Sequence, residues 1–307
     1  MNPKPTSYHH LPVMLMPTIQ ALALQKDGTY VDLTFGGGGH ARLILEQLGP
    51  KGRLIAFDQD PASAQEAIKI KDKRFTFVRA NFRFLTQFLA FHKITHVEGI
   101  LADLGISSYQ LDTAERGFAN RIDGPLDMRM NLDNPHSAAY IIERYSQGQL
   151  AYILTHYGEV PNGKRLAAQI VRARRIAPIT TTTQLKNIAM LLAPKKYPNK
   201  YFAKVFQAFR IAVNDELGAL ESMLLQVPKV LKRSGRLVVL AYHALEDRLV
   251  KNMIKTGNLA GHSEKDFYGN LLAPLQPLHR KVIKPTQKEI AHNNRARSAR
   301  LRVATKV

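Results

Sequence analysis

Residues 30–45, Tyr30-Val31-Asp32-Leu33-Thr34-Phe35-Gly36-Gly37-Gly38-Gly39-His40-Ala41-Arg42-Leu43-Ile44-Leu45, decide the fold. The first six are rich in aromatic and β-branched side chains, which predicts a strand. Four glycines follow, and the apolar residues after them predict a helix that ends at Gly49-Pro50. A strand, a glycine turn and a helix start together let a nucleotide-like ligand approach bare backbone. A glycine run is also compatible with a flexible loop, so the rest of the chain must decide.

Further apolar runs predict strands at residues 53–57, 75–78, 97–104 and 236–242, and helical patterns separate most of them. Strands that alternate with helices, and that are this apolar, indicate a parallel sheet covered on both faces. Two short runs near the end, around residues 279–283 and 300–304, predict a closing pair of antiparallel strands. We therefore expect an α/β fold with a Rossmann-like sheet.

The alternation stops between residues 110 and 201, where we find helical patterns and no convincing strand. Helices are predicted at residues 137–142, 149–157, 164–175 and 183–192. A loop of this length is implausible, so the segment predicts an inserted all-α domain. We expect a sheet domain formed by residues 1–109 and 202–307, with a single long amphipathic helix at 202–231 where the sheet domain resumes.

The chain of 307 residues has 44 Lys and Arg against 24 Asp and Glu, a formal charge of +20. This surplus favours nucleic acid as the partner, although a merely solvated basic surface is the alternative. No stretch approaches the ~20 apolar residues of a membrane span, and no signal peptide is recognisable. The chain has no cysteine, which fits a reducing cytoplasm, and its histidines lack metal-ligand spacing. We expect a cytoplasmic protein with no membrane partner and no metal.

Asp58 ends the second predicted strand, 20 residues after Gly38, where Rossmann-like folds place an acid on ribose hydroxyls. The alternative is an ordinary helix-capping aspartate. Gly36-x-Gly38-x-x-Ala41 can be fitted to the dinucleotide fingerprint, so NAD competes as the cofactor. Asp32 favours S-adenosylmethionine instead, because a carboxylate before the glycines attracts a cation and repels a pyrophosphate. The predicted closing strand pair also suits methyltransferase sheets, by analogy of fold.

Asp103 ends the fourth predicted strand and faces the crevice where open α/β sheets bind ligands. Methyl transfer to an amine or hydroxyl requires alignment and removal of a proton, with no covalent nucleophile. Methylation of pyrimidine carbon 5 normally requires a cysteine thiolate, which this chain lacks. Nitrogen or oxygen is therefore the expected acceptor, and a base amine must be splayed out to reach the pocket.

Two other clusters have more than one interpretation. Residues 123–130, Asp-Gly-Pro-Leu-Asp-Met-Arg-Met, suggest by spacing a tight turn with a local Asp–Arg pair. His243 and Glu246-Asp247-Arg248 stand where the fifth strand turns to helix. They form either a capping and ion-pair cluster or part of a pocket wall.

Long motifs in a fixed order resemble the ribosomal RNA small subunit methyltransferase H family nearly from end to end. They are Asp32-x-Thr34-x-Gly36-x-Gly38-Gly39-His40, Asp103-Leu104-Gly105-x-Ser107-Ser108-x-Gln110-Leu111-Asp112, Arg116-Gly117-Phe118, Asp123 to Met130, Phe206-Gln207-Ala208-x-Arg210-Ile211-x-Val213-Asn214-x-Glu216-Leu217, His243-x-Leu245-Glu246-Asp247-Arg248 and Arg295-Ala296-Arg297-Ser298-Ala299. The glycine motif alone is weak, whereas this ordered set is highly specific.

The resemblance implies an S-adenosylmethionine-dependent methyltransferase acting on the N4 amino group of a cytidine in 16S rRNA of the small ribosomal subunit. It implies that the helical insertion recognises the substrate, with Asp127 and Arg129 on the substrate side. We expect Asp103 to be the catalytic residue, lying between cofactor and target amine and orienting one or both. The resemblance places cofactor contacts on Gly38, Gly39, His40, Asp58, Phe82, Asp103 and Gln110. The chain departs from the family pattern at Ala41, Ala119 and Ala244, where serine is expected, and at Tyr109, where proline is. A nicotinamide oxidoreductase and a non-catalytic rRNA-binding assembly factor are the competing functions.

Overall fold

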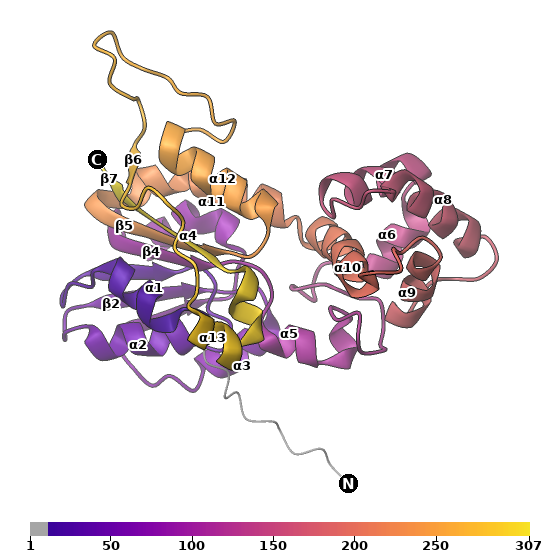
Figure 1. The fold of residues 1–307 in the computed structure, drawn as a ribbon. Helices are drawn as coiled ribbons and strands as arrows, with labels where there is room; N and C mark the ends of the chain where they lie inside the picture. The colour runs from indigo at the N-terminus through magenta and orange to yellow at the C-terminus, as the bar shows by residue number, and fades with distance from the viewer. Residues whose placement is uncertain (1–11) are drawn as a thin grey trace. The chain divides into compact units, whose positions relative to one another are not determined.

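The computed structural model describes residues 12–307, which form two compact units (Figure 1). The sheet unit combines the described residues up to Gly105 with Leu217–Val307, and the helical unit is Ile106–Glu216. The chain thus leaves the sheet unit after its fourth strand and returns to it before the fifth. Each unit has a hydrophobic core of its own.

The sheet unit is built on seven strands in the order β3-β2-β1-β4-β5-β7-β6. The strands are β1 (Thr29–Asp32), β2 (Arg53–Phe57), β3 (Phe75–Val78), β4 (Val97–Asp103), β5 (Leu231–Ala241), β6 (Leu275–Pro277) and β7 (Arg300–Lys306). The first five are parallel, and β7 runs antiparallel to both β5 and β6. The strand order reverses between β1 and β4, so the crevice for a ligand lies at the carboxyl ends of these strands. The predicted α/β fold, with a Rossmann-like sheet and an antiparallel closing strand, is confirmed.

Helices cover both faces of the sheet (Figure 1). One face carries α4 (Leu85–Phe91), α11 (Glu216–Val230) and α12 (Ala244–Thr256), and the other α1 (Leu15–Leu22), α2 (Gly39–Gln47) and α3 (Pro61–Ala67). Successive residues of a strand point to opposite faces of the sheet, so Val31 packs with the first set of helices and Tyr30 with the second. This burial on both faces explains why the strands are continuous apolar runs. The short helix η1 (Phe82–Phe84) follows β3, and α13 (Gln287–His292) and η3 (Asn294–Ser298) precede β7.

The helical unit packs around a separate core that includes Leu150, Ile170 and Phe209. Its helices are α5 (Ser108–Asp112), η2 (Ala114–Arg116), α6 (Ala138–Arg144), α7 (Gln147–His156), α8 (Gly163–Arg174), α9 (Thr182–Met190) and α10 (Pro198–Asn214). The four helices predicted between residues 137 and 192 are all present, and Thr181 caps α9 with a reciprocal bond to Gln184. Nowhere in residues 12–307 is a helix both long and apolar enough to cross a membrane.

Two details of the prediction are wrong. The single helix expected at residues 202–231 is two helices, α10 and α11, because Asp215 adopts a left-handed conformation with φ of 46°. The first closing strand is Leu275–Pro277 and not the run at 279–283, from which Ile283 contributes only an isolated bridge to Leu301. Leu275 is buried, and Pro277, which has no N–H to donate, suits an edge strand.

Asp247 joins α12 to the antiparallel edge of the sheet. Its Oδ1 accepts a 2.6 Å hydrogen bond from Arg302 Nε, and its Oδ2 accepts from Arg302 Nη2 at 3.1 Å and from Arg300 Nη1 at 3.2 Å. Burial pushes the pKa of Asp247 upward, but the hydrogen bonds and charges of the two arginines hold it below its ordinary value. The ion pair therefore contributes stability above pH ~4 that is lost as pH falls through the lowered pKa.

We expect Asp247→Asn to lower the free energy of unfolding at pH 7 by about 1–3 kcal/mol, because it leaves two arginines short of their acceptor. Urea denaturation at pH 7 and pH 3 checks this, and the gap between wild type and variant should narrow at pH 3. Glu143→Gln, which removes an exposed pair with Arg144, is the control and should change stability by less than about 0.5 kcal/mol. Equal stability of Asp247→Asn and wild type at pH 7 would contradict the assignment.

Candidate functional site

Three aspartates meet at one edge of the sheet. Asp32 ends β1, Asp103 ends β4, and Asp58 directly follows β2, which pairs with β1 on the other side. Asp32 is buried, and burial together with the charges of Asp103 and Asp58 raises its pKa to about 7, against the hydrogen bond from the Thr34 N–H. A buried, uncompensated carboxylate is costly. This acidic edge, defined as Asp32, Asp58 and Asp103, is therefore suited to a cationic ligand.

Asp58 connects the glycine turn to α3. Its Oδ2 accepts hydrogen bonds from the Gly36 N–H at 2.8 Å and from Ser63 Oγ at 2.8 Å, and its Oδ1 accepts from the Asp60 N–H at 2.9 Å. Burial nevertheless raises the pKa of Asp58 above its ordinary value. Asp60, not Asp58, caps α3 by accepting from the Ala62 N–H. The capping alternative for Asp58 is thus not what the structure shows.

The turn before α2 requires glycine at particular positions. Gly38 has φ of +78°, and a Cβ there would lie 2.7 Å from the Phe35 ring. Gly39 begins α2, and a Cβ on it would lie 2.2 Å from Pro12. The first turn of α2 has no side-chain cap, so its N–H groups can bind an anionic group such as a carboxylate.

His40, in the first turn of α2, is buried, and burial lowers its pKa to about 4. It is therefore neutral at pH 7, and its Nδ1, 3.9 Å from Asp103 Oδ2, is too far for a hydrogen bond. Within the described residues, His40 Nε2 and Asp32 Oδ2 are both buried without a hydrogen-bond partner. Such atoms are rare in folded proteins, and a bound polar ligand is one way to satisfy them.

Asp103 is held from two directions. Its backbone N–H donates to Thr34 Oγ1 at 2.7 Å, and its Oδ1 accepts a 2.7 Å hydrogen bond from the Tyr242 hydroxyl, which follows β5. Burial raises the pKa of Asp103 to about 7, opposed by that hydrogen bond and supported by the charge of Glu246. Our sequence reasoning did not single out Tyr242. The only available signal was a polar-tipped residue at the end of the strand beside β4.

Phe82 begins η1 after β3, at the same edge of the sheet, and is half-buried against the core. Asn81 Nδ2 donates to Gln59 Oε1 at 3.1 Å, which ties the loop after β3 to the loop that contains Asp58. The structure therefore brings together Gly38, Gly39, His40, Asp58, Phe82 and Asp103 of the predicted cofactor residues.

The other predicted site residues lie in the helical unit. Gln110 is buried in α5 and forms a capping box with Ser107, accepting from its N–H at 2.9 Å. Asp127 and Arg129 form a two-bonded pair, at 2.9 and 2.8 Å, around Met128 at φ of 61°. The local Asp–Arg pair suggested by spacing is thus present, and a substrate role for these two residues stays a prediction.

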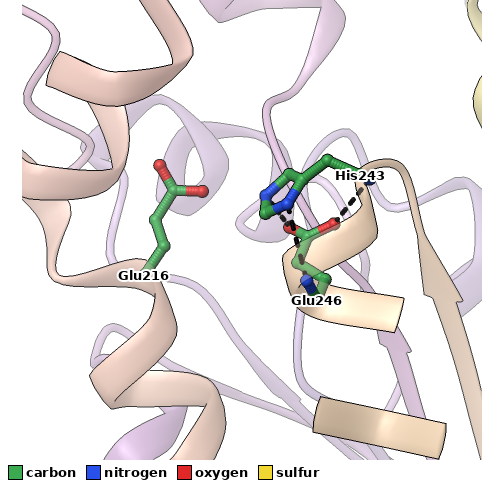
Figure 2. Close-up of side chains that lie close together, drawn as sticks. All are labelled: Glu216, His243 and Glu246. Atoms are coloured by element: carbon green, nitrogen blue, oxygen red, sulfur yellow. Dashed lines mark hydrogen bonds and ion pairs between the residues drawn. The ribbon is translucent and has the colours of Figure 1, made fainter. Parts of the chain in front are cut away.

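The cluster at the start of α12 is a helix cap (Figure 2). Glu246 Oε2 accepts from the N–H groups of Tyr242 and His243, at 2.9 and 3.3 Å, and Glu246 N–H donates to His243 Nδ1 at 3.4 Å. Figure 2 shows the imidazole of His243 lying against the Glu246 carboxylate. Of the two interpretations left open by the sequence, capping and ion pairing is the one that the structure bears out.

The chemistry of these donors and acceptors fits S-adenosylmethionine. Its sulfonium and α-amino groups suit the acidic edge, and its carboxylate suits the uncapped first turn of α2. The pyrophosphate of a dinucleotide would instead lie beside the carboxylates of the acidic edge, which repel it. The acidic edge therefore argues against NAD as the cofactor.

Comparison with known proteins gives consistent matches over nearly the full length. The sequence model of the MraW methylase family matches residues 7–307. Ribosomal RNA small subunit methyltransferase H of Amoebophilus asiaticus is 51% identical over 300 residues, covering 98% of this chain and 96% of that protein. The protein of the same name from Bacteroides fragilis is 48% identical over 306 residues, covering 100% of both. A solved rRNA methylase from Streptococcus thermophilus is 10% identical, with a TM-score of 0.40 over 95% of each chain.

We expect Asp32→Asn to stabilise the ligand-free protein while weakening its binding of S-adenosylmethionine. Because burial raises the pKa of Asp32, the stability associated with its protonated form is fully present below pH ~4 and lost as pH rises through about 7. The amide keeps the acceptor for the Thr34 N–H and removes the charge. The free energy of unfolding at pH 8 should therefore rise by on the order of 1–3 kcal/mol, and the dissociation constant by about tenfold or more.

Urea denaturation and titration calorimetry measure the two effects. Asp27→Asn, at an exposed loop residue, is the matched control and should change neither. Lower stability of Asp32→Asn with unchanged affinity would mean that Asp32 is only structural.

Proposed function

The chain belongs to the MraW methylase family and is an S-adenosylmethionine-dependent methyltransferase, and we propose that it methylates the N4 amino group of a cytidine in 16S rRNA of the small ribosomal subunit. The observation that carries the proposal is the acidic edge beside the glycine turn, with Asp32 buried and Asp58 and Asp103 half-buried, which suits a cationic methyl donor. The rRNA methyltransferase names of the relatives support the substrate class. The proposal places the reaction in the cytoplasm.

In this proposal, different residues contact different parts of the cofactor. Gly38, Gly39 and His40 hold the methionine end, Asp58 the ribose, and Phe82 the surroundings of the adenine. The Asp58 carboxylate accepts hydrogen bonds from the Gly36 N–H and Ser63 Oγ, which fix its position. The ribose hydroxyls bind to this same carboxylate. Gln110 is carried over from the family resemblance as a further contact.

When bound, S-adenosylmethionine supplies a methyl group on a positively charged sulfur that departs as a neutral thioether. The acceptor nitrogen forms the new N–C bond as the C–S bond breaks with its electron pair going to sulfur, and that nitrogen must lose one proton. Asp103, which the bound cation favours in its ionised form, accepts a hydrogen bond from the target amine on Oδ2 and takes this proton. Tyr242 occupies Oδ1 and so fixes which oxygen is available.

The helical unit, with residues 110–201 at its centre, is proposed to recognise the rRNA. The turn that contains Asp127 and Arg129 is held rigid by their ion pair and by Arg129 bonds to the carbonyls of Leu132 and Asn134. Lys164, Arg165 and Arg172 on α8, and Arg175 directly after it, are exposed and can contact phosphates. Arg174 is instead used structurally, donating to the carbonyls of Ile142 and Tyr145.

Incubation of unmethylated small subunits with methyl-labelled S-adenosylmethionine, followed by nucleoside mass analysis, tests the proposal. We expect labelled N4-methylcytidine with wild type and none with Asp103→Asn. Calorimetry should show that Asp103→Asn still binds the cofactor, which separates lost chemistry from lost binding. Absence of labelled N4-methylcytidine on every assembly intermediate, with rRNA binding intact, would favour the non-catalytic assembly factor.

Tyr242 is a positioning residue, and we expect Tyr242→Phe to lower kcat by about 10- to 100-fold, with little change in KM for the cofactor. The Tyr242 hydrogen bond lowers the pKa of Asp103, so its loss raises that pKa. The rise of kcat with pH should therefore move to higher pH. Steady-state kinetics from pH 6 to 9 measure both effects.

Tyr268→Phe changes an exposed hydroxyl in the same unit and serves as the control. A fall in kcat without a shift of the pH profile would mean that Tyr242 acts only through stability.

A further inference from the structure

A second polar feature of the sheet unit lies away from the acidic edge, where α12 packs against β6 and β7 (Figure 1). The surface has a small depression there. Lysine and arginine dominate its lining, as Lys251, Lys255, Lys281 and Arg302, with His279 beside them. Ile254 and Val303 are among its apolar residues, and no lining residue is acidic. We call it the α12–β6 pocket.

The positive charge of the pocket is not neutralised by the protein. Asp247, which pairs with the lining residue Arg302, also accepts from Arg300. Within the described residues, no ion pair joins Lys251, Lys255 or Lys281 to a carboxylate. Three ammonium groups from two distant segments of the chain therefore converge without a counter-charge.

Fold stability alone does not explain this arrangement. Lys251 and Lys255 are four residues apart on α12, and like charges at that spacing disfavour a helix by a few tenths of a kcal/mol. Lys255 lies in the last turn of α12, where a cation is favourable, but that applies to neither Lys251 nor Lys281. An anion bound in the pocket would relieve the repulsion.

We propose that the α12–β6 pocket binds a backbone phosphate of the substrate rRNA, an inference that rests on the proposed function. Lysines are flexible point charges that suit phosphate oxygens, and such contacts set the position of an RNA without reading its sequence. Lys255 and Lys281 are exposed, so their long side chains can reach a phosphate of a continuous chain that lies across the surface. Bound here, the rRNA gains a contact on the sheet unit in addition to any on the helical unit.

The test is the triple variant Lys251→Ala, Lys255→Ala, Lys281→Ala, with binding of unmethylated small subunits measured against salt concentration. Each phosphate contact contributes about 0.7–0.9 to the slope of log K against log salt. We expect the slope to flatten by about 0.7–0.9, the contribution of one phosphate, and the affinity near 0.1 M salt to fall by about fivefold. KM for the subunit should rise, while cofactor affinity and kcat stay as in wild type.

The matched control is Lys51→Ala, Lys71→Ala, Lys73→Ala, which removes the same charge from exposed residues before β2 and β3. If both triple variants lose affinity equally, only net charge matters and the pocket is not a site. If inorganic phosphate binds the pocket at millimolar concentration while subunit binding is unaffected by the substitutions, the occupant is a small anion and the rRNA assignment is wrong. If wild type itself neither binds nor methylates subunits, the proposed function fails as well.

Discussion

The site is organised around the acidic edge of the sheet, where the charges of three aspartates act on one another and Asp32 is buried. Asp32 is almost inaccessible and has one oxygen without a partner, and the neighbouring charges of Asp58 and Asp103 raise its pKa further. At neutral pH an ionised carboxylate here lowers folding stability relative to an apolar or amide side chain, which would bring no charge into the interior. A ligand that carries positive charge compensates this cost. The sulfonium of S-adenosylmethionine meets that requirement, and a dinucleotide phosphate does not.

Hydrogen bonds at the same edge also join the loops in which its aspartates lie. Thr34, within the glycine turn, accepts from the Asp103 N–H, and Asp58, after β2, accepts from the Gly36 N–H. The loops after β1, β2 and β4 are therefore tied to one another by hydrogen bonds between side chain and backbone. Tyr242 extends the network to β5, so Asp103, at the end of β4, is held by residues that follow β1 and β5.

Much of this could be predicted from the sequence because its signals are local. Apolar runs, glycine turns and capping threonines depend on neighbours in the chain, and the sheet, α2 and the helices near Thr181 follow from them. The break at Asp215 could not be predicted, because the amphipathic pattern continues across it and only its left-handed backbone ends α10. Tyr242 was missed for a related reason: its role comes from a partner 139 residues away, Asp103. The Asp127–Arg129 pair was suggested by its spacing, whereas its use by substrate rests on family resemblance.

Proton release on cofactor binding tests the central claim most directly. The pKa values of Asp32 and Asp103 are both about 7, so near pH 7 each carboxyl is partly protonated, and a bound cation should drive both to ionise. Titration calorimetry of S-adenosylmethionine in buffers of different ionisation enthalpy counts the protons exchanged. The account predicts that wild type releases more protons at pH 7 than Asp32→Asn does. Equal proton exchange by the two proteins would contradict it.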